Sequence, residues 1–308
     1  MQQTKNNIKQ DLFGFNDQGI NYDQARPVYP SKFIQQIQDS IPQKQKTNYL
    51  DIATGTGQLL FQIAPKFQGK QIIGNDISEK QLSIAQEKAD KYNKNTEKKI
   101  NLILCDFQQI PQKLSEKNLT EKFDLITIGQ ALHWLDVDKF LQICKNDLLK
   151  KDGRLVVLGY IAQGFEFNTK NQNFNKEGLK HYEKYYNTVG PYFDFNRDEL
   201  TQGYKGFDEK YCFSKYFKNI KFQDEIQFLP GPLDKYIQYC KTFSAYGTYK
   251  SKFQENSDFI DPAEVLAQET RSELDQYYKN QNNQENQNQN ELLYKNYFFY
   301  YILDNNIE

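Results

Sequence analysis

The residues whose types and spacing most clearly indicate chemistry occupy positions 49–59, Tyr-Leu-Asp-Ile-Ala-Thr-Gly-Thr-Gly-Gln-Leu. An apolar run leads into Asp51, two glycines follow with one residue between them, and an apolar helical pattern comes next. We interpret this order as a buried strand, a tight turn and the start of a helix. Gly55 and Gly57 would let the backbone pass close to a ligand, because a Cβ atom there would collide with it. The segment therefore predicts a site for a nucleotide-like cofactor, and the alternative is a glycine turn without a ligand.

Two details of this loop distinguish between cofactors. A dinucleotide-binding fingerprint has a third glycine three residues after Gly57, where this chain has Leu60, and the P-loop lysine is also missing. Asp51 would repel a pyrophosphate, but it would attract a ligand that carries an ammonium and a sulfonium group. These details favour S-adenosylmethionine over NAD, FAD and ATP.

Acidic residues end two further predicted strands. The strand at 71–77 ends in Asp76, about 20 residues past the glycines, where an acid is placed to accept hydrogen bonds from both ribose hydroxyls of an adenosine. The strand at 100–107 ends in Asp106 and Phe107, which suit the amino group and the ring face of adenine. In parallel α/β sheets, ligands bind beyond the carboxyl ends of the strands. We therefore expect these residues to meet at one edge of a sheet.

The elements that must position these residues alternate between strand and helix patterns, which predicts a parallel α/β sheet. Further strands are expected at 122–129, 153–159, 220–229 and 292–303, and the 292–303 strand is expected to run antiparallel at the sheet edge. Helices are expected at 178–187, 233–249 and 262–279.

At this point the chain resembles a known group, the class I S-adenosylmethionine-dependent methyltransferases of the small-molecule type. The segments at 22–30, 123–134, 190–197 and 242–246 also resemble landmarks of a subgroup related to trans-aconitate methyltransferases. The resemblance implies a Rossmann-like, seven-stranded, mostly parallel sheet with an antiparallel last strand, helices on both faces, and a helical, aromatic cap. Two residues depart from the pattern: Ala53 stands where the superfamily often has glycine, and Phe193 stands where we expect tryptophan.

The resemblance also implies a set of site residues. For binding the cofactor we expect Tyr22, Arg26, Asp51, Ala53, Gly55, Thr56, Gly57, Asp76, Ile77, Asp106, Phe107, Gln130 and Ala131. For catalysis and substrate binding we expect His133, Trp134, Arg197 and Tyr246.

The roles of the second group remain open at this point. His133 could orient the substrate or act as a base for a hydroxyl, or it could simply pack beside Trp134, which is itself either a pocket wall or core. The implied substrate is a small carboxylic acid that becomes a methyl ester, and Arg197 with Tyr246 would anchor its carboxylate. Arg26 could do the same or close the N-terminal segment over the cofactor. For each arginine the alternative is a structural salt bridge.

Composition excludes several classes of function. The 308-residue chain has a net charge of −1 and no basic run, which disfavours nucleic-acid binding. Four scattered cysteines indicate reduced thiols, and two histidines are too few for a convincing zinc site. We find no signal-peptide pattern and no apolar run of about 18 residues. We therefore expect a cytoplasmic protein that binds no metal, does not contact a membrane and acts on a small-molecule substrate. We favour a monomer.

The expected organisation has five parts. Residues 1–20 are predicted to be a mobile N-terminus, 21–45 a lid segment, 46–160 the cofactor-binding core, 161–250 a substrate cap with a sixth strand, and 251–308 a C-terminal helix, a low-complexity insert at 281–291 and the last strand. Two functional alternatives stay open: a catalytically inactive methyltransferase-like scaffold subunit, and a protein or RNA methyltransferase.

Overall fold

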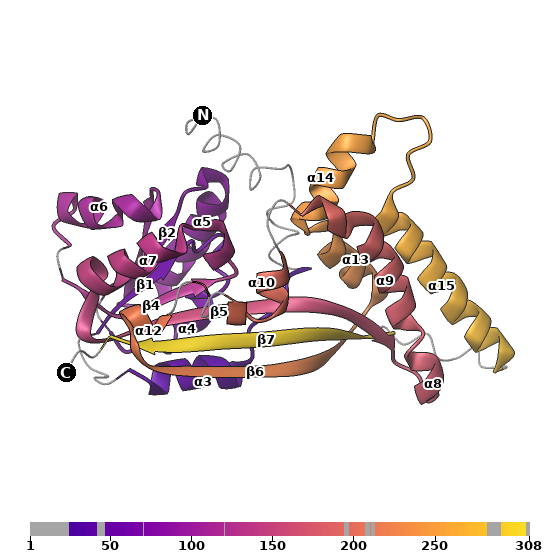
Figure 1. Cartoon of the computed structure of the whole chain (residues 1–308), viewed down its shortest axis with the longest axis horizontal. Helices are drawn as coiled ribbons and strands as arrows, with labels where there is room; N and C mark the ends of the chain where they lie inside the picture. The colour runs from indigo at the N-terminus through magenta and orange to yellow at the C-terminus, as the bar shows by residue number, and fades with distance from the viewer. Residues whose placement is uncertain are drawn as a thin grey trace.

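The computed structural model describes residues 25–41, 47–69, 71–119, 121–193, 197–206, 210, 213–281 and 291–305. Its centre is a seven-stranded sheet with the order β3-β2-β1-β4-β5-β7-β6 (Figure 1). The strands are β1 Asn48–Ile52, β2 Gln71–Asp76, β3 Lys99–Leu104, β4 Phe123–Gly129, β5 Leu149–Phe167, β6 Lys218–Gly231 and β7 Leu292–Asp304. Strands β1 to β5 pair in parallel, and β7 runs antiparallel to both β5 and β6. This confirms the predicted Rossmann-like fold class.

Helices surround this sheet. They are α3 Ser31–Asp39, α4 Leu60–Ile63, α5 Glu79–Asn95, α6 Ile110–Glu116, α7 Val137–Ile143, α8 Gln172–Asn175, α9 Gly178–Val189, α10 Arg197–Thr201, α12 Phe213–Tyr216, α13 Leu233–Lys241, α14 Ser244–Phe253 and α15 Pro262–Asn280. Short 3-10 turns lie at Phe107–Gln109, Leu132–Trp134 and Gly190–Tyr192, and a π-helical turn lies at Cys144–Leu148.

Alternation along the central strands builds two hydrophobic cores, one on each face of the sheet. Tyr49 and Leu125 belong to the cluster that includes the apolar faces of α3 and α4. Their sequence neighbours Leu50 and Ile126 belong to the other cluster, which includes the apolar faces of α6 and α7. Successive side chains of a strand point to opposite faces, so strands covered by helices on both sides must be apolar throughout.

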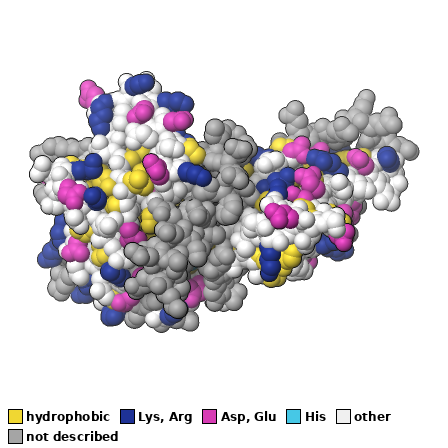
Figure 2. Space-filling view, turned by 90° about the horizontal axis from the view of Figure 1, so that it is seen from above, with side chains coloured by type: hydrophobic (Ala, Val, Ile, Leu, Met, Phe, Trp, Pro, Cys, Tyr) yellow, Lys and Arg dark blue, Asp and Glu magenta, His cyan; other side chains and the backbone are white. Residues whose placement is uncertain are grey.

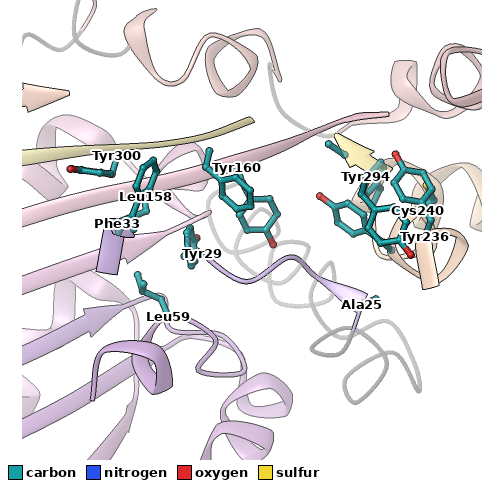
Figure 3. Packing of buried hydrophobic residues seen from close by; sticks show 14 of the residues in the cluster. Ala25, Tyr29, Phe33, Leu59, Leu158, Tyr160, Tyr236, Cys240, Tyr294 and Tyr300 are labelled. Atoms are coloured by element: carbon teal, nitrogen blue, oxygen red, sulfur yellow. The ribbon is translucent and has the colours of Figure 1, made fainter. Parts of the chain in front are cut away.

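Beyond the core, the long strands β5, β6 and β7 carry a helical cap (Figure 1). Helix α9 packs against α15 and β5, and α13 packs against α15. His181 of α9 contacts the carboxylates of Glu269 and Glu273 on α15. Figure 3 shows Tyr236, Cys240 and Tyr294 grouped at this end, where Tyr236 packs edge-on against Phe165 with ring centroids 4.9 Å apart. The cap is thus rich in aromatic side chains, as its sequence indicated.

Three predicted elements differ from the structure. The strand expected at 153–159 is β5, which continues to Phe167 because its second half pairs with β7. The strand β7 lies between β5 and β6, so β6 and not β7 forms the sheet edge. The single helix expected at 233–249 is two helices, because Phe243 adopts an extended conformation between α13 and α14.

Candidate cofactor site

A cleft opens at the carboxyl ends of β1, β2 and β4. Its empty volume is about 840 Å³, a figure that includes the solvent-filled space at its open mouth. The lining residues are Tyr29, Asp51, Ala53, Thr54, Gly55, Thr56, Gln58, Leu59, Asp76, Ile77, Gln81, Gly129, Gln130, Ala131, Trp134, Leu135 and Tyr160. The structure therefore brings together nine residues expected from the sequence: Asp51, Ala53, Gly55, Thr56, Asp76, Ile77, Gln130, Ala131 and Trp134.

The loop after β1 has the backbone conformation that its glycines suggested. Gly55 and Gly57 have φ angles of +58° and +84°, a region that residues with a Cβ atom rarely adopt. Added Cβ atoms would lie 2.6 Å from Gln81 Oε1 and 2.4 Å from the Phe61 ring, respectively. Ala53 has φ +53° without being glycine, so this loop contains a locally strained residue at the cleft.

Asp76 joins this loop to the start of α5. Its carboxylate accepts hydrogen bonds from the backbone N–H groups of Gly55 (2.7 Å) and Ser78 (2.8 Å). Burial raises the pKa of this carboxyl, while hydrogen bonds from backbone N–H groups, including that of Ile77, oppose the rise. A carboxylate has about four lone-pair sites, so Asp76 retains the capacity to accept hydrogen bonds from a ligand in the cleft.

Asp51 is buried at the floor of the cleft within a chain of hydroxyl groups. Thr54 Oγ1 donates to one carboxylate oxygen at 2.6 Å, and Thr127 Oγ1 donates to the other at 2.5 Å. Burial raises the pKa of Asp51 to about 7, the two threonine hydroxyls oppose this rise, and the negative charge of Asp76 adds to it. Near neutral pH, Asp51 is therefore balanced between its two protonation states, and a cation in the cleft would favour the ionised one.

Gln130 offers a further acceptor. Its φ is +58°, and its side-chain amide nitrogen donates to the Tyr160 carbonyl at 2.6 Å. The side-chain oxygen of Gln130 is buried and has no hydrogen-bond partner. A buried acceptor without a donor is costly, so a ligand N–H group in the cleft would satisfy it.

His133 and Trp134 are neighbours in the turn after β4, but only one of them lines the cleft. Trp134 lines the cleft, whereas His133 is not among the lining residues and its Nδ1 lies 2.6 Å from the Tyr204 hydroxyl. The His133 ring also packs against those of Trp134 and Tyr204, with centroids 5.4 and 5.9 Å away. The contacts of His133 therefore agree with the packing alternative, and its catalytic role stays a prediction.

The two residues of the expected adenine pair, Asp106 and Phe107, both have local structural contacts. Asp106 is half-buried and caps the following 3-10 turn by accepting from Gln108 N at 2.9 Å. Phe107 is buried in the core on the face of the sheet that α6 and α7 cover, where its ring packs edge-on against Phe140 with centroids 6.0 Å apart. Neither residue is among those that line the cleft. Phe107 thus has a packing role that its position after a strand did not reveal.

Several other expected site residues lie elsewhere. The Arg26 guanidinium donates to the Thr242 carbonyl at 2.9 Å and lies 5.6 Å from the centre of the Tyr239 ring, so it attaches the N-terminal segment to the cap. Tyr246 is buried, and its hydroxyl donates to Asp261 at 2.7 Å. Arg197 begins α10, but its side chain and all of Tyr22 lie outside the described residues.

Two aromatic walls of the cleft were missed by the sequence reasoning. Tyr29 and Tyr160 pack edge to face, with ring centroids 5.5 Å apart, beside Leu59 (Figure 3). Tyr29 comes from the segment before α3, and Tyr160 comes from the extended half of β5. The landmark segment at 22–30 included Tyr29, but its contact with Tyr160 depends on the order of strands in the sheet.

The donor set of this cleft fits S-adenosylmethionine. Asp76 and Asp51 supply carboxylates, the Gln130 side chain supplies an unsatisfied acceptor, and the loop after β1 contributes Ala53, Thr54, Gly55 and Thr56 to the lining. In the described ranges no group of three or more His, Cys, Asp or Glu side chains is placed to hold a metal ion. No described helix is long and apolar enough to cross a membrane. Basic and acidic side chains are interspersed on the face shown in Figure 2.

Comparisons with known proteins agree with this geometry. A family model described as a methyltransferase domain matches residues 43–198. A Dictyostelium discoideum protein provisionally named as a methyltransferase is 29% identical over 172 residues, which cover 55% of this chain and 55% of that protein. The chain thus spans about half the length of this curated relative.

Two solved structures are also similar. A Bacillus halodurans protein, provisionally named as a methyltransferase, is 14% identical, with a TM-score of 0.45, and the match covers 90% of this chain and all of that one. Haemonchus contortus phosphoethanolamine N-methyltransferase 2, in complex with S-adenosylmethionine, is 18% identical, with a TM-score of 0.39, and the match covers 87% of this chain and 52% of that one.

The family model includes the glycine loop, Asp76 and the whole floor of the cleft, and it matches just over half of the chain. At the level of this domain, the predicted methyltransferase class is confirmed. The chain belongs to the methyltransferase-domain family.

Proposed function

We propose that the whole protein transfers a methyl group from S-adenosylmethionine to a small molecule. The observation that carries this proposal is the convergence of Asp51, Asp76 and the glycine loop on one cleft, whose lining also includes the aromatic residues Tyr29, Trp134 and Tyr160. Asp76 would accept hydrogen bonds from the ribose hydroxyls, and Asp51 with the Gln130 side-chain oxygen would receive the ammonium group. The cofactor supplies an electrophilic methyl group on a sulfonium.

The remaining task of the protein is to position the substrate relative to the methyl group of the cofactor. Trp134, Tyr29 and Tyr160 would exclude water and present ring faces and edges toward the substrate. Positioning of reactants can contribute roughly 7–11 kcal/mol in favourable cases, and cation–π attraction to a sulfonium contributes about 0.5–2 kcal/mol. Neither contribution requires a general base, which agrees with the packed position of His133.

We assign a carboxylic-acid oxygen as the methyl acceptor, following the resemblance to the trans-aconitate methyltransferase-like subgroup. A carboxylate is already a nucleophile. Arg197 and Tyr246 are the two expected anchors of the substrate carboxylate. Because the Tyr246 hydroxyl already donates its hydrogen to Asp261, we assign this role to Arg197. Cytoplasmic location, a monomeric state and the absence of a nucleic-acid partner stay predictions from the sequence.

One observation favours a second acceptor, an amine. The side chains that line the cleft include two carboxylates, Asp51 and Asp76, and no Lys, Arg or His within the described part of the chain. An amine approaching in its protonated form would find favourable charge there, and it would release its proton to solvent before its nitrogen lone pair displaced the methyl group from the sulfonium. The two acceptors differ in what Arg197→Lys should do: it should weaken use of an acid and leave use of an amine unchanged.

Calorimetric titration tests the cofactor part of the proposal. The purified protein should bind S-adenosylmethionine and S-adenosylhomocysteine and should not bind NAD. Asp76→Asn should weaken both by about tenfold or more, because a hydrogen bond to a charged acceptor contributes about 1.5–3 kcal/mol. Asp258→Asn, a change at an exposed acid outside the cleft, is the matched control and should bind as the wild type does. No binding to the wild type would contradict the proposal and favour a scaffold subunit.

A labelled-methyl assay tests the substrate. Panels of small carboxylic acids, phenols and amines would be offered with S-adenosylmethionine, and protein and RNA fractions would be offered separately. Transfer to an acid supports the assigned acceptor, and transfer to an amine supports the second one. Transfer only to protein or RNA would contradict a small-molecule substrate.

A further inference from the structure

The hydroxyl groups behind Asp51 form a chain that reaches across two strands. Asp51 and Tyr49 lie on β1, and Thr127 lies on the neighbouring strand β4, where it pairs with Asp51 in the sheet register. Thr127 Oγ1 contacts the Asp51 carboxylate at 2.5 Å and the Tyr49 hydroxyl at 2.9 Å. Thr127 and Tyr49 are fully buried, and neither is among the residues that line the cleft.

The direction of the hydrogen bonds in this chain is fixed by chemistry. An ionised carboxylate can only accept, so Thr127 must donate its single hydroxyl hydrogen to Asp51. Tyr49 must then donate to the Thr127 oxygen, and burial raises the pKa of Tyr49, which keeps that hydrogen in place. The chain therefore points its hydrogens toward Asp51 when Asp51 carries its charge.

We infer that Thr127, oriented by Tyr49, is a positioning residue that fixes the direction of the Asp51 carboxylate and keeps it ionised for a cationic cofactor. This inference rests on the proposed function, because it assumes that the cleft binds S-adenosylmethionine. Four groups face Asp51 from the elements around it. They are Thr127 on β4, Tyr49 on β1, Thr54 in the loop after β1, and Asp76 on β2, whose negative charge opposes ionisation of Asp51.

Removing the Thr127 hydroxyl should change how cofactor binding depends on pH. Valine keeps the shape of threonine but offers no donor, so Asp51 would ionise at a higher pH in Thr127→Val. A charge-assisted hydrogen bond of ordinary strength corresponds to a shift of roughly one to two pH units. Thr127→Ser keeps the donor and should restore the wild-type profile. Tyr49→Phe should give a smaller shift in the same direction.

The test is a series of calorimetric titrations with S-adenosylmethionine between about pH 6 and pH 9.5. The measured quantity is the ratio of the variant Kd to the wild-type Kd, because titration of the ligand itself cancels in this ratio. For Thr127→Val the ratio should be roughly five to fifty near pH 7 and should approach one above about pH 9. Thr270→Val is the matched control, since Thr270 is also fully buried but its hydroxyl has no hydrogen-bond partner.

The Asp51→Asn variant tests whether Thr127 changes the pH dependence of Kd through the Asp51 carboxylate. In this background the addition of Thr127→Val should produce no further pH-dependent change in Kd, because no carboxylate remains to be held. A Thr127→Val ratio that stays constant across pH, or that equals the Thr270→Val ratio, overturns the inference while leaving the cofactor assignment intact. Absence of binding to the wild type at every pH overturns both. If Thr127→Val does not fold, an unshifted profile for Tyr49→Phe overturns the inference.

Discussion

We expect Asp51 to make the free protein less stable at neutral pH, and Asp51→Asn to relieve this effect. Burial raises the pKa of Asp51 from 3.8 to about 7, so the folded chain holds this proton more tightly than the unfolded chain. The stabilising contribution of the proton is fully present below about pH 4 and is lost as pH rises through about 7. A rise of roughly three pKa units corresponds to about 4 kcal/mol above that pH.

Asparagine can occupy position 51 with hydrogen-bond partners for both its amide oxygen and its amide nitrogen. Its amide oxygen can accept from one of the hydroxyls of Thr54 and Thr127, and its amide nitrogen can donate to the other, because a hydroxyl both donates and accepts. Asp51→Asn should therefore be more stable than the wild type at high pH in the absence of cofactor, even though it removes a residue of the cleft. Stabilising a protein at the expense of a binding site is a common trade-off.

The assay is urea unfolding of both proteins, without cofactor, at about pH 5.5 and pH 8. The advantage of Asp51→Asn should grow by about 2 kcal/mol over this interval, since roughly 1.5 pH units of it lie below the pKa of Asp51. The raised pKa of Asp76 acts in the same direction in both proteins and largely cancels in the difference. With saturating S-adenosylmethionine, the wild type should gain more stability than the variant. An equal difference at both pH values, or a variant weaker than the wild type at pH 8, would refute the reasoning.

Three further changes test the backbone of the site by urea unfolding. Gly57→Ala should lower the free energy of unfolding by about 1–3 kcal/mol, because φ is +84° and the new Cβ atom would meet the Phe61 ring at 2.4 Å; an unchanged midpoint would contradict this. Gly247→Ala lies in α14, where no atom is within 4 Å of an added Cβ, and should raise the free energy of unfolding by about 0.5–1 kcal/mol; a loss of stability would show that the space is not open. Ala53→Gly should raise it by a similar amount, because Ala53 has φ +53°, and no gain would mean that the strain is absent.

Most of the fold followed from the sequence because its signals are local. Apolar runs that end in Asp51 and Asp76 predicted strands whose carboxyl ends meet at one edge, and the structure places both acids in one cleft. The glycine spacing predicted the tight loop between them. These patterns depend on side-chain alternation and on backbone sterics, which a short segment fixes by itself.

The errors in the fold came from long-range pairing. The length of β5 is set by β7, whose partner residues lie more than a hundred positions later in the chain. The interior position of β7 and the edge position of β6 are likewise decided by pairing. An isolated strand has no preference for a neighbour, so propensity alone cannot give these outcomes.

The same division holds within the site. The sequence by itself determined the acids and the glycine loop and predicted the class of cofactor, because each is defined by residues close together along the chain. Only the tertiary structure decided that Thr127 holds Asp51, that Tyr29 meets Tyr160, and that His133 pairs with Tyr204. These contacts join distant segments, and their geometry exists only once the order of strands has brought those segments together.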